Sequence, residues 1–449
     1  MEPDQKRLLI AIVLGIALVF AWYPAVTWIG EKFGYDFTTP PIEETTDPKD
    51  STDPADPTTR EAVAEVENMD PADPVDTPAG DGTVITPIGE VAAVTLGSTT
   101  RDDPTYALGV ELTPNGGGVA SVVLNGFKRD VDAEEPYVFE KAYEGGGDVT
   151  RPFTPQSVVI GGETVSLVGA EWGLAESTQT TATYGVRVGD LVEVYVDYAV
   201  TEKSAEGSGY EVQVVYRIAN LTGEKLGTQL VFAGPTTPPA ELEDRPDRQI
   251  VAGFYEGEDF EVEQLIVQSF DEDQPSVNLG SELTDNAVMT WAGASTIYFQ
   301  ALVRPTLTEQ QITDEQIPQP FDSIVATLLN PEVRNVKQRE VALLFNTKPR
   351  TIAAGGTYEL PLTVYFGPKL RALMQSDYYN GNLTRFEKTL IAPTGCTFCV
   401  FDPVVNVLNA LLRFWHFIFN DWGLAIVGLV AIVRLALHPI TKRSQINMM

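Results

Sequence analysis

Residues 192–198 read Val-Glu-Val-Tyr-Val-Asp-Tyr, so apolar and polar side chains alternate along this stretch. The stretch 210–218, Tyr-Glu-Val-Gln-Val-Val-Tyr-Arg-Ile, places an apolar residue at every second position. A period of two puts all these apolar residues on one face of an extended strand. Each stretch therefore predicts a β-strand with one buried face and one face exposed to solvent.

The same pattern extends through the middle of the chain. Between residues 90 and 368, short alternating runs are separated by turns rich in glycine and asparagine. Many short strands, each with one apolar face, are typical of a large antiparallel β-sandwich. We expect such a domain, a β-super-sandwich, over 90–368, closed by a helical segment over 369–395. Further alternating runs are 107–113, 119–124, 296–303, 341–345 and 358–366.

A second feature is the apolar segment 8–30, which Lys6 and Arg7 precede. A helix of this length would extend roughly 34 Å at about 1.5 Å per residue, enough to cross the apolar core of a bilayer. A cleaved signal peptide is the rival interpretation, but residues 21–24 read Ala-Trp-Tyr-Pro, which is bulky where a signal peptidase requires small side chains. We therefore expect transmembrane helix 1 over 8–30, with residues 1–7 in the cytoplasm.

The C-terminal segment 421–440 is also apolar, and after its first residue its only charged side chain is that of Arg434. We assign this segment to transmembrane helix 2. Lys442 and Arg443 follow it. By the positive-inside rule they place the end of this helix in the cytoplasm, where a cytoplasmic region begins over 441–449.

Residues 396–420 are expected to form a loop and an amphipathic helix that lies in the membrane interface, because apolar residues recur there at helical spacing. Asn420 and Asp421 favour a helix cap before the second span. Aromatic rings with a polar edge are favoured at the boundary between membrane and water. The residues that we assign to this boundary are Trp22, Tyr23, Trp28, Trp415 and Trp422.

Between the first span and the sandwich lies a stretch of different composition, 31–89. Asp-Pro pairs recur in it among many threonine and glutamate residues. Proline removes backbone donors and like charges repel, so we expect a disordered acidic tether. The whole chain is acidic as well: 63 acidic and 30 basic residues give a net charge of −33, which argues against binding to nucleic acids.

The two spans and the sandwich together define one topology. Both spans have basic residues at their cytoplasmic ends, so everything between them lies on the other side of the membrane. The sequence thus predicts a mixed membrane protein, in which two transmembrane α-helices flank a large antiparallel β-sandwich.

No catalytic site is recognisable in the predicted sandwich. Sugar epimerases built on large sandwiches need a histidine beside the sugar, but both histidines, His416 and His438, lie outside this region. No hydrolase, metalloprotease or nucleotide-binding motif stands in a suitable context. We therefore predict that the chain is not an enzyme and needs no cofactor.

Cys396 and Cys399 form an isolated Cys-x-x-Cys pair. Such a pair is half of a zinc site, and the spacing of Asp402 and His416, which could complete it, is not diagnostic. We predict no metal. Outside the cytoplasm, the two cysteines are a candidate disulfide, or else two unreactive thiols.

Arg434 has two interpretations. A charge within a membrane span costs a few kcal/mol or more and usually faces a partner or a watery cavity. Arg434 also lies eight residues before Lys442, about 12 Å along a helix, so its long side chain could instead reach the cytoplasmic headgroups. Position alone does not decide between the two.

The C-terminal segment carries motifs that, together with weaker ones in the sandwich, point to a known family. The stronger motifs are Asn420-Asp421-Trp422-Gly423, Ile432-Val433-Arg434 and Pro439-Ile440-Thr441-Lys442. The weaker ones are Asn115-Gly116-Gly117, Tyr298-Phe299 and Gly367-Pro368. On these residues and on its layout, the chain resembles the N-terminal part of the YidC membrane protein insertases of double-membraned bacteria, as far as their second transmembrane helix.

The resemblance implies a function and a compartment. A YidC-like protein would assist the insertion and folding of integral membrane proteins in the inner membrane, alone or with the Sec translocon, with the bulk of this chain in the periplasm. Arg434 would lie in a hydrophilic groove that receives polar segments of nascent membrane proteins. The other implied partners are the lipid bilayer and, through the part of the family beyond this region, the ribosome.

The chain departs from the family pattern at its C-terminus. Further spans are expected after Lys442, whereas the sequence ends at Met449. We expect either that the chain is a fragment of a longer insertase or that another chain supplies the missing half. An alternative function stays open, that of a membrane-anchored periplasmic binding module with a carbohydrate-binding-like β-sandwich.

Overall fold

The computed structural model describes residues 84–390, apart from 130–132, 146–147, 241–247, 258, 285 and 381–382, and residues 402–447. The predicted first span, 8–30, lies outside the described residues, as does the tether as far as residue 83. The last part of the predicted tether differs from the prediction. Ile85–Pro87 forms strand β1, which pairs with β11 (Thr181–Val188), because this short run is apolar enough to join the sheet edge.

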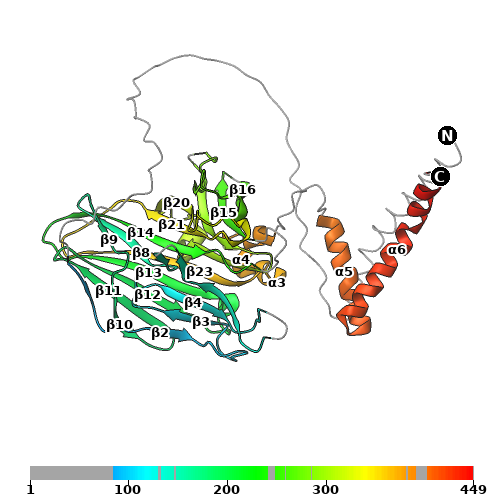
Figure 1. Ribbon diagram of the computed structural model, residues 1–449, viewed down its shortest axis with the longest axis horizontal. Helices are drawn as coiled ribbons and strands as arrows, with labels where there is room; N and C mark the ends of the chain where they lie inside the picture. The colour runs from blue at the N-terminus through cyan, green and yellow to red at the C-terminus, as the bar shows by residue number, and fades with distance from the viewer. Residues whose placement is uncertain are drawn as a thin grey trace, which may run out of the picture. The chain divides into compact units, whose positions relative to one another are not determined.

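The described strands form one ten-stranded and one seven-stranded antiparallel sheet (Figure 1). The ten-stranded sheet runs in the order β1, β11, β12 (Val192–Val200), β13 (Glu211–Asn220), β23 (Thr357–Pro368), β19 (Phe299–Pro305), β18 (Val288–Ser295), β15 (Gln249–Glu256) and β16 (Asp259–Ile266), with β10 (Gly173–Ser177) also paired to β11. The seven-stranded sheet runs β17 (Ser276–Asn278), β20 (Phe321–Leu328), β21 (Val341–Thr347), β14 (Leu226–Thr236), β8 (Pro155–Ile160) and β9 (Glu163–Ser166), with β22 (Arg350–Ile352) on β14.

Two smaller sheets and several helices complete the described part. A four-stranded sheet contains β2 (Val94–Gly97), β3 (Leu108–Leu112), β4 (Val119–Leu124) and β5 (Tyr137–Lys141), and β6 (Tyr143–Gly145) pairs with β7 (Asp148–Thr150). The α-helices are α2 (Glu309–Thr313), α3 (Arg371–Met374), α4 (Asp377–Asn380), α5 (Asp402–Phe419) and α6 (Trp422–Asn447). The 3₁₀-helices are η1 (Glu206–Gly209), η2 (Val267–Ser269), η3 (Val336–Gln338) and η4 (Phe386–Leu390).

The two stretches that predicted strands form β12 and β13, and they pair with each other. As predicted, the alternate apolar residues of β12 are buried, from Val192 to Tyr198. The apolar face of β13 meets side chains of another sheet: the centre of the Tyr216 ring lies 4.4 Å from that of Phe232 in β14. Because apolar faces of different sheets enclose one core, the prediction of an antiparallel β-sandwich is confirmed.

The hydroxyl groups of two core tyrosines donate hydrogen bonds to loops on the far side of the core. The Tyr198 hydroxyl donates to the Gly117 carbonyl at 2.8 Å, and the Tyr216 hydroxyl donates to the Phe153 carbonyl at 2.9 Å. Burial raises the pKa of both tyrosines well above the ordinary value. Both hydroxyls therefore stay protonated and serve as permanent donors, which fixes the loops before β4 and β8 over the core.

Part of the ten-stranded sheet is buried on its second face as well. Val251, Leu302 and Tyr365 point away from the main core, since their neighbours in the chain belong to it. On this second face they pack with Trp291 and with residues of the helical segment 371–390. The indole nitrogen of Trp291 donates to the Thr384 carbonyl at 2.6 Å. This second core holds the helices α3, α4 and η4 against the sheet.

Strand β16 is the last strand at one edge of the ten-stranded sheet. It pairs with β15 along its whole length. Its acidic residues Asp259, Glu261 and Glu263 alternate with Phe260 and Val262, which pack against the second core. The edge strand is therefore apolar on the face toward the second core, whereas Asp259 and Glu261 on its other face are exposed and Glu263 accepts a hydrogen bond from the Gly280 N–H at 2.7 Å.

Helix α6 contains the predicted second span, 421–440, except for its first residue, and its side chains are described as far as Arg434. Within the described residues, none of the helices combines the length and the apolar character needed to cross a bilayer. Helix α5 occupies most of the segment for which an amphipathic helix was predicted.

The turn at Gly117 provides a test of the sandwich. Its φ is +60°, and a Cβ there would lie 2.9 Å from the Trp172 ring. We expect Gly117→Ala to lower the free energy of unfolding by about 1–3 kcal/mol, through backbone strain and overpacking. Urea unfolding followed by tryptophan fluorescence measures this change. Gly126→Ala is the matched control, because a Cβ at Gly126 would meet nothing within 4 Å; equal losses for both variants would contradict the packing described.

Candidate functional site

Helices α5 and α6 are joined by a tight turn with a cap on each side. Asn420 has a φ of +50°, and its N–H donates to the His416 carbonyl at 2.7 Å, which ends α5. The Asp421 carboxylate accepts a hydrogen bond from the Leu424 N–H at 2.8 Å, which caps the start of α6. The cap predicted at Asn420 and Asp421 is confirmed. The two helices therefore form a hairpin with a fixed turn.

The hairpin closes on small residues of α6. A Cβ at Gly428 would lie 3.0 Å from the Trp415 ring, so this indole packs where α6 has no side chain. Ala425, one turn nearer to the hairpin turn, is fully buried. Near the turn, the His416 ring stacks on the Trp422 ring with 3.8 Å between their centres. These contacts fix how α5 lies along α6.

Large apolar side chains cover the outside of the hairpin. Phe417 and Val427 are 68% and 64% exposed, although a soluble helix pair would bury such residues. Large apolar side chains gathered on an exposed surface are typical of sites that contact a membrane or another protein. The other large exposed apolar residues described here are Val407, Leu408, Phe414, Ile418, Phe419, Trp422, Leu424, Ile426 and Val430.

Arg434 lies on α6, twelve residues after Trp422, which is about 18 Å along the helix. Its side chain is exposed. None of the described carboxylates forms an ion pair with it. The structure therefore presents a positive charge on a helix whose other described side chains up to that point are apolar or small.

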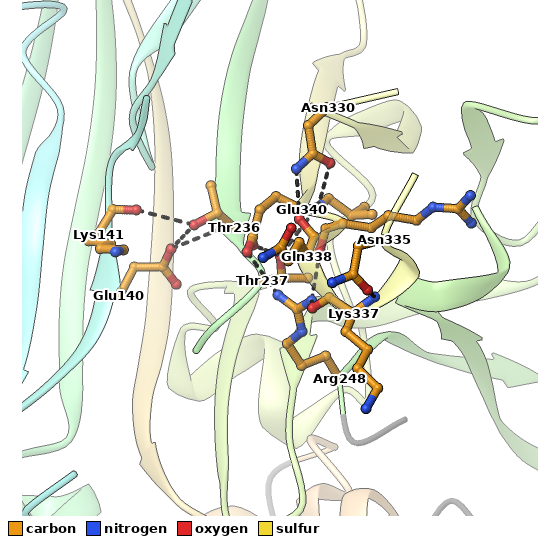
Figure 2. A network of polar contacts seen from close by, with 12 residues as sticks. Glu140, Lys141, Thr236, Thr237, Arg248, Asn330, Asn335, Lys337, Gln338 and Glu340 are labelled. Carbon is orange, nitrogen blue, oxygen red and sulfur yellow. Dashed lines mark hydrogen bonds and ion pairs between the residues drawn. The ribbon is translucent and has the colours of Figure 1, made fainter. Parts of the chain in front are cut away.

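The sandwich contains a polar network that sequence reasoning did not single out (Figure 2). Arg248, at the start of β15, is 2% exposed, and its Nη1 lies 2.9 Å from Oε1 of Glu340. Its Nη2 donates to the carbonyls of Lys337 and Arg339. The Thr237 hydroxyl donates to Oε2 of Glu340 at 2.5 Å. The network thus links the end of β14 with the starts of β15 and β21.

Glu140 of β5 lies at the other side of this network (Figure 2). Its Oε1 accepts hydrogen bonds from the Thr236 N–H, at 3.0 Å, and from the Thr236 hydroxyl. Burial raises the pKa of Glu140 to about 8. In the sequence it is one acid among 63, and the alternation of β5 alone would place either Phe139 or Glu140 outside. No signal in the sequence could therefore have identified it.

Comparison with known proteins gives a family likeness. The chain is 24% identical over 375 residues to the membrane protein insertase YidC of Shewanella baltica strain OS195, covering 80% of this chain and 60% of the relative. It is 24% identical over 371 residues to the YidC insertase of Vibrio cholerae, covering 81% and 60%. This chain resembles the YidC membrane protein insertases. The resemblance inferred from the motifs is confirmed, and the chain spans about 60% of the length of these relatives. No family model matches the chain.

Solved structures give a weaker likeness. A galactose mutarotase-like protein from Lactobacillus casei matches with a TM-score of 0.38 and 12% identity, over 61% of this chain and all of that one. A galactose mutarotase related enzyme from Lactobacillus acidophilus matches with a TM-score of 0.40 and 9% identity, over 62% and 100%. Scores this low support no conclusion about fold or activity.

Some of the site residues predicted from the resemblance to YidC lie among the described residues, and others do not. Trp415 and Trp422 lie on either side of the hairpin turn, and Arg434 lies further along α6. Lys442 and Arg443 also lie on α6, but their side chains are outside the described residues. The other predicted residues that lie outside are Lys6, Arg7, Trp22, Tyr23, Trp28, Cys396 and Cys399.

The contact between Trp415 and Gly428 can be tested by overpacking. In Gly428→Leu, the new side chain would occupy the position of the indole, so we expect a hairpin destabilised by about 1–3 kcal/mol. Spin labels at Asn409 and Val430, in a chain whose two native cysteines are serine, should then show a longer and broader distance distribution. The control is Val427→Leu, which changes an exposed neighbour; the packing described would be wrong if the control and Gly428→Leu gave the same distribution.

Proposed function

We propose that this chain is part of a membrane protein insertase of the YidC type. The observation that carries the proposal is the similarity to YidC insertases over about 80% of the chain. Because the chain spans only about 60% of those relatives, the activity of the whole protein is carried over here as part of the proposal. The protein would assist insertion and folding of nascent membrane proteins at the inner membrane, alone or with the Sec translocon, without acting as an enzyme.

The hairpin supports a membrane location. Its exposed apolar residues, such as Phe417 and Val427, would gain free energy on transfer into lipid, at about 25 cal/mol per Å² of apolar surface removed from water. In this proposal residues 421–440 cross the membrane, and α5 lies in the interface with Trp415 and Trp422 near the headgroups. The sandwich then lies on the periplasmic side and 8–30 forms the other span.

Arg434 would lower the cost of bringing polar substrate segments into the membrane. A polar segment of an incoming protein that enters hydrocarbon without a partner costs several kcal/mol. In the proposal, Arg434 lies in a hydrophilic groove, where its guanidinium attracts acidic and polar segments and keeps water beside them. The apolar segment of the same substrate then enters lipid, which is favourable. The rest of the groove would come from parts of the protein that follow this region.

A cationic role of Arg434 can be measured by insertion of a small membrane protein with an acidic external segment. In the natural protein, reconstituted in lipid vesicles, we expect Arg434→Ala to reduce the insertion rate roughly tenfold to a hundredfold, because a hydrogen bond to a charged group contributes about 1.5–3 kcal/mol. Arg434→Lys should retain part of the rate. Arg413→Ala, which removes an exposed arginine from α5, is the control; unchanged insertion by Arg434→Ala would refute the groove role.

The membrane location has its own test. Val427 on α6 and Val168 in the sandwich are 64% and 61% exposed, so single cysteines at these sites, with both native cysteines replaced, carry labels equally well. A polarity-sensitive fluorophore in vesicles should emit at shorter wavelength from position 427 than from position 168. Identical emission from the two sites would show that the hairpin stays in water.

A further inference from the structure

Strand β5 is irregular at the point where it presents Glu140. Val122 of β4 pairs with Glu140, but the next residue, Val123, pairs with Val138. One extra residue, Phe139, therefore stands in β5, which is a β-bulge. A bulge re-aims the side chains beside it. As a result Phe139 and Glu140 are consecutive and yet both are buried, at 0% and 1% exposure.

Strand β14 has an irregularity of its own opposite Glu140. Ala233 pairs with Leu344 of β21, whereas the next pair joins Thr236 to Ala342, so β14 also contains an extra residue. Thr236 is 4% exposed there and donates both its N–H and its hydroxyl to Glu140. Since β5 belongs to the four-stranded sheet and β14 to the seven-stranded sheet, two bulges create one hydrogen-bonded junction between sheets (Figure 2).

The second oxygen of the carboxyl group, Oε2 of Glu140, is buried and has no hydrogen-bond partner in the described part of the chain. The charged group that faces Glu140 is Glu340, which has the same sign. The guanidinium of Arg248 is bound to Glu340, and Lys141, the next residue in β5, is exposed. Among the described residues no free cation faces this carboxyl group, and a buried carboxylate beside a second acid is strongly disfavoured. Burial beside Glu340 therefore favours the protonated form of this carboxyl group, although the two hydrogen bonds from Thr236 act in the opposite direction.

We propose that Glu140 is a proton-binding site that joins the four-stranded sheet to the seven-stranded sheet. With its proton, the carboxyl group is neutral and holds β5 against β14 through Thr236. When the proton passes to water, a negative charge is left buried beside Glu340, and β5 separates from β14. The junction is thus a conformational device that opens more readily as the pH rises.

The direction of the pH effect follows from linkage. Burial raises the pKa of Glu140 in the folded chain to about 8, from a usual value of 4.5. Between these two pH values the folded state holds one proton more than the unfolded state, so stability falls as the pH rises. The contribution of Glu140 to the unfolding equilibrium constant should increase about tenfold per pH unit in this window and level off above it.

Hydrogen exchange of the full chain, in the detergent or membrane that holds it, tests the proposal. We expect the amides of β5 and of the end of β14 to lose protection progressively as the pH rises toward about 8 and to show no further loss above it, after correction for the intrinsic exchange rate. In Glu140→Gln, which keeps the size and one acceptor oxygen, this loss should disappear. Glu111→Gln changes an exposed acid of the same sheet and should behave like the natural chain. Equal pH dependence in Glu140→Gln, or none in the natural chain, would overturn the proposal.

A second measurement applies if Glu140→Gln does not fold. Exposed carboxyl groups are ionised at pH 6, so a carboxylic acid that is still protonated there must be shielded. The infrared spectrum of the natural chain should show the C=O stretch of a protonated carboxyl group at pH 6, and this band should disappear with a midpoint near 8. A spectrum without such a band at pH 6 would refute the proton-binding site.

Discussion

The burial of alternate apolar side chains on β12 and β13 is the constraint on which the rest of the domain depends. These strands lie within the ten-stranded sheet, and each offers one continuous apolar face. That face must be covered, and strands from the other sheets supply the cover through contacts such as that between Tyr216 and Phe232. The turns that carry Gly117 and Phe153 are in turn held by tyrosine hydroxyls that cross the core. The positions of these two loops thus depend on the same core that buries the faces of β12 and β13.

How much of this could be predicted from the sequence depends on the range of the interaction. The period of two identified β12 and β13 because it is a local signal, and Asn420 with Asp421 identified the helix cap before α6 for the same reason. The pairing of β13 with β23 joins residues more than 130 positions apart, and no local pattern encodes it. The bulge at Phe139 could not be predicted either, because a one-residue shift in register does not change the composition of the strand. Arg434 was found by its isolation among apolar residues, whereas Gly428 acquires a meaning only when Trp415 is packed against it.

The sandwich and the hairpin follow opposite rules for their surfaces. In the sandwich, most of the large apolar residues are buried in two cores. In the hairpin, small residues lie between the helices and large apolar ones face outward. The second arrangement is the one that helix pairs use in lipid, where close backbone approach replaces the hydrophobic effect between helices. One chain thus combines two modes of packing, and this contrast supports the proposal that the hairpin lies in the membrane.

Strand β16, which has no further strand beside it among the described residues, has a consequence for how copies of the protein meet at high concentration. An open strand offers unpaired backbone groups on which another polypeptide can add, and sheets that grow in this way end as aggregates. The exposed carboxylates of Asp259 and Glu261 give that edge a negative charge, so two copies that meet edge to edge repel each other. In the proposed role the protein works beside unfolded substrate proteins. An uncharged strand edge could pair with their extended segments. The negative charge of β16 opposes the addition of further strands and so protects a mostly β-structured protein from aggregation.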